Sequence, residues 1–438
     1  MAGGGLMQLI VYGSQDIYLT GNPQITFYKA VYRRHTNFAV ESIQQSVQGS
    51  IKFGNNVSVS IKRNGDLLKK LWVQYSPQNL LSGINEVRWS GDVVGANVGH
   101  SLLDTIDLLI GGQLIDRHYG KWLTIWNYLT DKNDNGLQGP IDEHGTGPGE
   151  GSVIGDSATN NYISRPTQYN RMAYTHRANP DVISSTGAPM YAYIPLQFWF
   201  CRHPGLAIPL IALQYHEVIL NIKLGSYSGI TNCPTQTGRE LIDFAVYADY
   251  VYLDTTERRQ FAQNSHEYLI DQVQLNSNMS TSVINLNFSH PVKELIWAIP
   301  PTSAVDVNYT LNVSGPAGSS SPPSSFFKTT PNYPNNYKLI LNGSDRFAER
   351  DITYFTRTQV WESHSGFGSV LFPDSIGVYS FALKPEEHQP SGTCNFSRLD
   401  KAQLARTNTA PLDPLDVYAI NYNVLRIVSG MGGLAFSN

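Results

Sequence analysis

Two stretches of the sequence decide the fold: Val59-Ser-Ile-Lys-Arg-Asn-Gly-Asp-Leu-Leu-Lys-Lys-Leu-Trp72 and, 225 residues later, Ile284-Asn-Leu-Asn-Phe-Ser-His-Pro-Val-Lys-Glu-Leu-Ile-Trp297. Each begins with an alternation of apolar and polar residues, passes through a turn at Asn64-Gly65 or His290-Pro291, and ends in a second strand that reaches a Trp. Alternation with a period of two indicates a half-buried strand. The recurrence of the whole unit predicts two copies of one β domain.

Two further pairs of segments recur in the same order. Leu108-Leu-Ile-Gly-Gly112-Gln and Leu339-Ile-Leu-Asn-Gly343-Ser are apolar strands that enter a glycine turn, and Asp and Arg follow closely in both. Tyr193-Ile-Pro-Leu-Gln-Phe198 and Tyr379-Ser-Phe-Ala-Leu-Lys384 are strands followed by a Pro/Gly turn. The offset between the copies is 225 to 231 residues for the first two pairs and 186 for the third. We therefore expect an insertion of about 45 residues in the first copy.

A stretch rich in Gly, Asn and Pro, at about residues 131–190, accounts for this insertion. It cannot supply a continuous apolar face and is predicted to be a long surface loop. The second copy has a smaller loop of this kind from Pro300 to Asn336. Because 438 residues exceed one ordinary domain, we predict three parts: an N-terminal arm at residues 1–26, a first jelly roll at 27–224 that carries the insertion, and a second jelly roll at 225–438.

The composition supports an all-β fold. Charged residues make up only 15% of the chain, well below the roughly 25% usual in soluble domains. The many Tyr residues suit a pleated, half-buried surface, and the abundant Gly, Pro and Asn suit turns. The predicted fold class is all-β, with two tandem eight-stranded jelly rolls and short helices in the loops.

Two short helices are expected. Asp254-Thr-Thr-Glu257 is a capping box that would open a helix running through Phe261, near the junction of the two copies. The other, at residues 119–129, is indicated by four apolar residues at helical spacing, namely Trp122, Ile125, Trp126 and Leu129. We expect this second helix to plug the end of a barrel rather than to form an aromatic ligand site.

The charge balance argues against direct binding of nucleic acid. The formal net charge is −4, whereas affinity for phosphate backbones comes from clustered Lys and Arg. Cys201, Cys233 and Cys394 fit neither a CxxC pair nor a dense disulfide framework, which indicates a reducing compartment. The N-terminus does not read as a signal peptide, and no apolar stretch reaches the roughly 18 residues of a membrane span. We expect a protein made in the cytosol.

No catalytic, cofactor or metal site is predicted. His216-Glu217 and His266-Glu267 are adjacent pairs, whose side chains on a strand would point to opposite faces. Asp104 and Asp107 could serve as a glycosidase pair, but solvated acids at a strand end are the favoured interpretation. The motifs GxSxG and GxxxxGK[ST] are absent, and the run from Gly145 to Gly151 lacks the flanking strand and helix of a phosphate loop.

One basic cluster stands out early in the chain. It consists of Arg33-Arg34-His35 together with Lys29. A contact with neighbouring proteins is the favoured interpretation, and a solvated face or contact with nucleic acid are the alternatives.

Four blocks spread from end to end carry a family resemblance. They are Thr20-Gly-Asn-Pro-Gln-Ile-Thr-Phe-Tyr-Lys-Ala-Val-Tyr-Arg-Arg-His-Thr-Asn-Phe-Ala39, Pro204-Gly-Leu-Ala-Ile-Pro-Leu-Ile-Ala-Leu-Gln-Tyr-His-Glu-Val218, Ser380-Phe-Ala-Leu-Lys-Pro with Gln389-Pro-Ser-Gly-Thr-Cys-Asn-Phe-Ser-Arg398, and Asn421-Tyr-Asn-Val-Leu-Arg-Ile-Val-Ser-Gly-Met-Gly-Gly-Leu-Ala435. Together they resemble the major capsid proteins of nucleocytoplasmic large DNA viruses, and among these most closely the capsid proteins of algal viruses.

The resemblance implies a structural protein without enzymatic activity. It implies a double jelly roll that forms a homotrimeric, pseudo-hexagonal capsomer, and many such capsomers tile an icosahedral shell. The implied partners are neighbouring capsomers and minor capsid proteins, with host-surface contacts through outer loops such as residues 131–190. An internal viral membrane would be met only indirectly, and nucleic acid not at all. The implied location is the virion capsid, after synthesis and assembly in the host cytoplasm.

Two alternatives stay open from the sequence. A jelly-roll scaffold also suits a carbohydrate-binding or carbohydrate-active protein, since folds of this kind host many functions. The other alternative is a minor capsid or spike component.

Overall fold

The computed structural model describes residues 4–11, 13–75, 98–132, 168–173, 175, 191–225, 244–298, 336–366, 376–407 and 414–436. The chain divides into two compact units, Met1–Asn37 and Phe38–Asn438. The first unit contains the predicted arm and holds two short helices, α1 (Gly4–Ile10) and α2 (Ile17–Thr20), neither of which has a buried residue. Among the described residues, no helix is both long and apolar enough to span a membrane.

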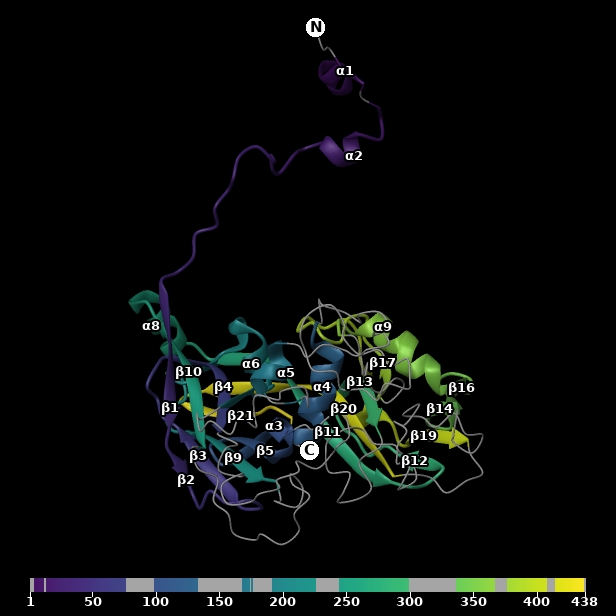
Figure 1. Ribbon diagram of the computed structural model, residues 1–438. Helices are drawn as coiled ribbons and strands as arrows, with labels where there is room; N and C mark the ends of the chain where they lie inside the picture. The colour runs from purple at the N-terminus through teal and green to yellow at the C-terminus, as the bar shows by residue number, and fades with distance from the viewer. Residues whose placement is uncertain are drawn as a thin grey trace, which may run out of the picture. The chain divides into compact units, whose positions relative to one another are not determined.

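The first half of the second unit is a sandwich of two antiparallel sheets (Figure 1). One sheet has the order β1-β10-β4-β7, with β8 paired to β4, and the other has the order β2-β3-β9-β5-β6. Their strands are β1 (Phe38–Gln45), β2 (Val47–Gln48), β3 (Asn56–Ile61), β4 (Leu67–Tyr75), β5 (Leu103–Ile110), β6 (Gln113–Tyr119), β7 (Ala192–Pro195), β8 (Ile208–Pro209), β9 (Val218–Leu224) and β10 (Ala245–Leu253).

The second half repeats this arrangement. One sheet has the order β11-β20-β13-β17, with β18 paired to β13 and β21 to β20, and the other has the order β12-β19-β14-β15, with β16 paired to β14. Their strands are β11 (His266–Met279), β12 (Val283–Asn285), β13 (Pro291–Ala298), β14 (Asn336–Leu341), β15 (Ser344–Asp345), β16 (Arg350–Asp351), β17 (Ile376–Ser380), β18 (Cys394–Asn395), β19 (Ala402–Thr407), β20 (Leu415–Val428) and β21 (Met431–Leu434).

The duplication predicted from the sequence is therefore present in the topology. Strand by strand, the order β1-β10-β4-β7 corresponds to β11-β20-β13-β17, and β3-β9-β5-β6 corresponds to β12-β19-β14-β15. In both halves the first repeated stretch crosses between sheets, because β3 and β4 belong to different sheets, as do β12 and β13. Eight corresponding strands in two facing sheets make each half a jelly roll, which confirms the predicted fold class.

The two repeated tryptophans nevertheless lie on opposite faces of their sheets. Trp297 is 1% exposed inside the core of the second barrel. Trp72 is half-buried, and its Nε1 donates to Oδ2 of Asp249 at 3.0 Å, while its neighbours Leu71 and Val73 fill the core of the first barrel. Because side chains alternate along a strand, a shift of one residue in the turn before β4 or β13 reverses the face. The similarity of the two stretches predicted the strands correctly, but it did not predict which face of the sheet each Trp occupies.

The second repeated pair forms matching hairpins. Gly111 and Gly112 have φ values of 58° and 81°, and Asn342 and Gly343 have values of 49° and 80°. Two successive positive φ angles at a two-residue loop define the type I′ turn, which matches the twist of the joined strands and favours Gly and Asn. The glycine turns predicted after Leu108 and Leu339 are therefore confirmed.

Both predicted helices are present. Helix α4 spans Gly120–Thr130 and α8 spans Thr255–Gln263. The capping box is not formed, because the Asp254 carboxylate accepts from the Thr256 hydroxyl rather than from a backbone N–H. The other helical segments are α3 (Val98–Ser101), α5 (Gln168–Ala173), α6 (Trp199–Arg202), α9 (Gln359–Ser363), the 3₁₀ turns η3 (Pro204–Leu206) and η6 (Phe396–Arg398), and the π-helix η5 (Tyr354–Thr358).

The predicted loops fall mainly outside the described residues. This holds for most of 131–190, including Gly145 to Gly151, and for 300–335. The predicted boundary at 224/225 precedes β10, which pairs with both β1 and β4 of the first barrel.

Candidate functional site

The histidine–glutamate pairs make separate structural contacts. Nδ1 of His216 lies 2.8 Å from the carbonyl of Gly432, and Nε2 of His266 lies 2.8 Å from the carbonyl of Phe261. Glu267 forms an ion pair with Arg426 at 2.8 Å. Among the residues that the structure describes, no three His, Cys, Asp or Glu side chains gather where they could hold a metal ion.

The carboxylates of Asp104 and Asp107 each pair with a different base. Asp104 lies 2.6 Å from Nζ of Lys223, and Asp107 binds Arg117 through both of its oxygens, at 2.6 and 2.7 Å. Each of the two carboxylates therefore has a cationic partner of its own.

The cysteines that the structure describes, Cys201 and Cys394, are free thiols. Burial raises the pKa of Cys201 to about 12 and raises the pKa of Cys394 above its usual value. Because the thiolate is the nucleophile, these groups are poor candidates for covalent chemistry. Cys233 lies outside the described residues.

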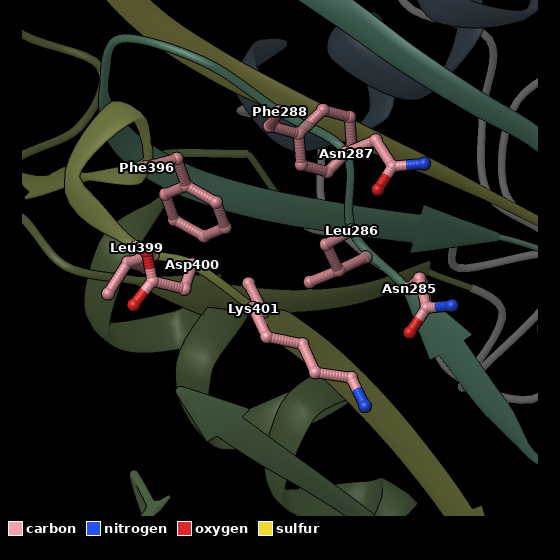
Figure 2. Close-up of a pocket in the computed structure, with 9 residues that line it drawn as sticks. Asn285, Leu286, Asn287, Phe288, Phe396, Leu399, Asp400 and Lys401 are labelled. Carbon is pink, nitrogen blue, oxygen red and sulfur yellow. The ribbon is translucent and has the colours of Figure 1, made fainter. Parts of the chain in front are cut away.

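A pocket of about 350 Å³ opens at one corner of the second barrel (Figure 2). The rings of Phe288 and Phe396 line it, with centroids 6.2 Å apart, and Asp400 and Lys401 lie on the side of β19. The other lining residues are Asn285, Leu286, Asn287, Leu399 and Ala402. With a single carboxylate and no His or Cys, this lining lacks both a nucleophile with its base and a pair of acids.

A third cluster of buried apolar residues, outside the two barrel cores, forms the junction between the barrels. Helix α4 projects Trp122, Trp126 and Leu129 onto the outer face of the sheet β20-β13-β17. Tyr418 of β20 lies with its ring centroid 5.3 Å from that of Trp122. The sheet is thus buried on both faces, and every residue of β13 after Pro291 is buried rather than every second one. The helix expected to plug the end of a barrel instead joins the two barrels.

Polar contacts fix the same junction. The side chain of Gln272 on β11 donates to the carbonyl of Ile115 on β6, and the backbone N–H of Val273 donates to Asp116 at 3.1 Å. The N–H of Gly366 donates to the carbonyl of Leu129 at 2.7 Å. These bonds tie the edge strand β6 of the first barrel to β11 of the second, so the junction has one defined geometry.

Buried charges accompany the junction. Lys293 is fully buried, and its Nζ lies 3.0 Å from Oδ2 of Asp271, which Arg202 of the first barrel also approaches at 3.0 Å. The guanidinium of Arg202 lies 5.0 Å from the ring centroid of Trp126. A buried ion that loses its partner is strongly destabilising, so this trio makes the two barrels depend on each other.

A second charged cluster surrounds His364, which lies just beyond α9. Its Nε2 is 3.1 Å from Glu294, and its Nδ1 is 3.0 Å from Glu386. Burial alone would lower the pKa of His364, but the two carboxylates outweigh it and raise this pKa to about 9. Sequence reasoning missed both charged clusters. The available signal was Lys293-Glu294, two charges inside an apolar strand.

The first unit presents a different kind of surface. Its apolar side chains are exposed, and the basic cluster Lys29, Arg33, Arg34 and His35 is exposed as well. The large exposed apolar residues are Leu6, Met7, Leu9, Ile10, Val11, Ile17, Tyr18, Leu19, Ile25, Phe27, Tyr28, Val31 and Tyr32. A concentration of exposed apolar side chains is typical of an interaction surface.

Comparison with known proteins gives a consistent family match. Residues 26–254 match the model described as "Major capsid protein N-terminus", and residues 257–433 match "Large eukaryotic DNA virus major capsid protein". The major capsid protein of Pyramimonas orientalis virus is 42% identical over all of both chains. That of Paramecium bursaria Chlorella virus 1 is 39% identical over 99% of this chain and 100% of the other.

Solved structures agree with the sequence matches. A chain of the PBCV-1 virus capsid superposes with a TM-score of 0.69 at 35% identity, over 94% of this chain and 100% of the other. The Faustovirus major capsid protein shares the fold with a TM-score of 0.63 at 13% identity, over 95% of this chain and 94% of the other. The carbohydrate-binding alternative receives no support from these relatives.

Proposed function

The chain belongs to the family of major capsid proteins of large eukaryotic DNA viruses, and on this premise we propose that three copies associate into a pseudo-hexagonal capsomer that tiles an icosahedral shell. The observation that carries the proposal is the repeated strand order of the two barrels. Three chains with two similar barrels each present six similar walls, which suits hexagonal tiling. Heterologous contacts between copies close into a ring when the rotation is 120°.

The rigid junction supports the same proposal. A capsomer can tile a lattice only if the angle between its barrels is constant. Apolar packing of α4 and the buried ions of Arg202, Asp271 and Lys293 hold that angle within each chain. The proposed role is structural, without a catalytic, cofactor or metal site.

Light scattering after size exclusion tests the trimer directly. We expect a stable species near three times 48.6 kDa, and electron microscopy of the same fraction should show particles of hexagonal outline. A monomer over the whole accessible concentration range would refute the proposal.

The proposed location is the virion, with synthesis and assembly in the host cytoplasm. Neighbouring capsomers and minor capsid proteins are the proposed partners. Outer loops such as residues 131–190 would meet the host surface. Nucleic acid would not be a direct partner, in keeping with the net charge of −4, and an internal membrane would be met only indirectly.

We propose that the N-terminal arm is ordered by neighbours along the inner side of the shell. Its support is the set of exposed apolar residues from Leu6 to Tyr32. The arm should be cleaved readily by protease in isolated trimers and be protected in assembled capsids. Equal resistance in both states would count against this role.

We also propose a division into domains that follows strand pairing. The first barrel would extend to Leu253, because β10 completes its sheet as β20 completes the other. Helix α8 would then be the linker. A chain cut within α8 should leave two protease-resistant fragments that stay together through the junction of α4, whereas a cut at 224/225 should separate β10 from its partners.

A further inference from the structure

The junction inside one chain serves as a template for a contact between chains. At that junction the first barrel contributes the edge strand β6 and the helix that follows it, α4. The second barrel contributes strand β11 and the outer face of β20-β13-β17. The first barrel therefore offers a helix at this junction, and the second barrel receives it.

The second barrel has a helical segment of its own. This segment, η5–α9, follows β16 as α4 follows β6. Phe355 is buried in the core of the second barrel and Val360 in the junction cluster beside α4, but Trp361 is 82% exposed. In α4, by contrast, Trp122 and Trp126 are both buried against the partner barrel. An exposed Trp is unusual on a helix whose counterpart uses tryptophan as its anchor.

The first barrel has a face that corresponds to the receiving face of the second barrel. On the outer face of β10-β4-β7, Tyr247 pairs with Trp72, and Tyr193 lies on the adjacent β7 with 41% of its surface exposed. Tyr247 occupies the strand and face that Tyr418 occupies in the second barrel, where Tyr418 receives Trp122 of α4. This aromatic face consists of Trp72, Tyr193 and Tyr247.

The exposure of strand β1 supports a contact on the same side of the first barrel. Its counterpart β11 is buried at Ile270, Asp271 and Gln272, where it contacts the first barrel. Most of β1 is exposed, with Gln45 its one buried residue. The second barrel of the same chain is already engaged at β6, so a second copy is the cover that we propose for β1.

We propose that Trp361 of one copy packs on the aromatic face Trp72, Tyr193 and Tyr247 of a second copy, in the manner of α4 within each chain. This inference rests on the proposed trimer, and it identifies Trp361 as the residue that anchors the contact between subunits. Repeated three times, the contact alternates with the internal junction around a closed ring of six barrels. Both sides are aromatic, which suits a desolvated hot spot at the centre of an interface.

Replacement of the anchor tests the contact. Trp361→Ala should weaken trimer formation by about 30-fold or more per interface, the range found for buried hot-spot tryptophans. Tyr193→Ala should weaken it in the same direction. Phe436→Ala, which also truncates an exposed aromatic residue, is the matched control and should leave the trimer intact. Light scattering across a dilution series measures all four proteins.

A cysteine pair makes the test independent of stability. Trp361→Cys combined with Tyr193→Cys should form a disulfide between chains on mild oxidation, whereas neither single variant should do so. A wild-type trimer that is unaffected by Trp361→Ala and uncrosslinked by the pair would overturn this inference and leave the proposed function standing. A wild-type protein that never forms trimers would overturn both. If Trp361→Ala fails to fold, the crosslink decides.

Discussion

Removal of the Trp126 side chain should loosen the junction between the barrels. Trp126 is 4% exposed, and its ring lies 5.5 Å from that of Trp122 and 5.0 Å from the guanidinium of Arg202. Truncation of a buried Trp to Ala costs about 3 to 5 kcal/mol, and a partly desolvated cation–π contact adds about 1 kcal/mol. Some of this cost is recovered if neighbours move into the space, so we expect Trp126→Ala to cost about 4 kcal/mol.

Hydrogen exchange is a suitable assay because it reports local opening. A cost of about 4 kcal/mol should accelerate exchange of the α4 amides by roughly 10³-fold, provided that these amides exchange through opening of the junction. Amides of β3, which is three strands away from β6 in the sheet order β2-β3-β9-β5-β6, should change much less. Phe436→Ala is the control and should change stability by no more than about 0.5 kcal/mol. Acceleration of less than tenfold in folded Trp126→Ala would refute the assignment of α4 as the element that joins the barrels.

Three further predictions follow from single sites. The pKa of His364 is raised to about 9, so the ion pairs of this side chain stabilise the fold fully below the unfolded-state pKa of about 6.5. This stabilisation is lost as the pH rises through 9. The difference in melting temperature between wild type and His364→Gln should therefore shrink from pH 6 to pH 10, and a constant difference would contradict this. Gly111→Ala should destabilise the fold more than Gly343→Ala. Both glycines have positive φ angles, but a Cβ at Gly111 would meet the His216 ring, whereas Gly343 faces open space. Equal urea midpoints of the two variants would count against the clash. Lys293→Ala should cost about 3 to 5 kcal/mol by leaving buried Asp271 with one partner fewer, and a urea midpoint like that of wild type would show that Arg202 alone suffices.

Local signals accounted for much of the fold. The turn residues Gly111-Gly112 and Asn342-Gly343 predicted hairpins because few other residues tolerate two positive φ angles in succession. The apolar spacing in α4 predicted a helix within one residue at each end. These features depend on a few consecutive residues, so the sequence is sufficient to identify them.

Features that depend on distant partners were harder to predict. The residues near Trp122 and Trp126 in the sequence do not indicate that these side chains cover the neighbouring barrel rather than the end of their own. The buried pairing of His364 with Glu294 joins residues 70 positions apart, and neither residue stands in a recognisable motif. Equally, the face that Trp72 occupies depends on one residue in a turn, because the side-chain period of a strand is two.

The sequence by itself determined that this chain is two copies of one β sandwich, and its end-to-end blocks determined the family. Repetition survives in sequence because each copy must fill its own core at matching positions. Only the tertiary structure decided how the copies meet, since the junction of α4 with β20-β13-β17 is built from residues far apart in the chain. It also decided which surfaces stay open, because Trp361 differs from a core tryptophan only in what surrounds it.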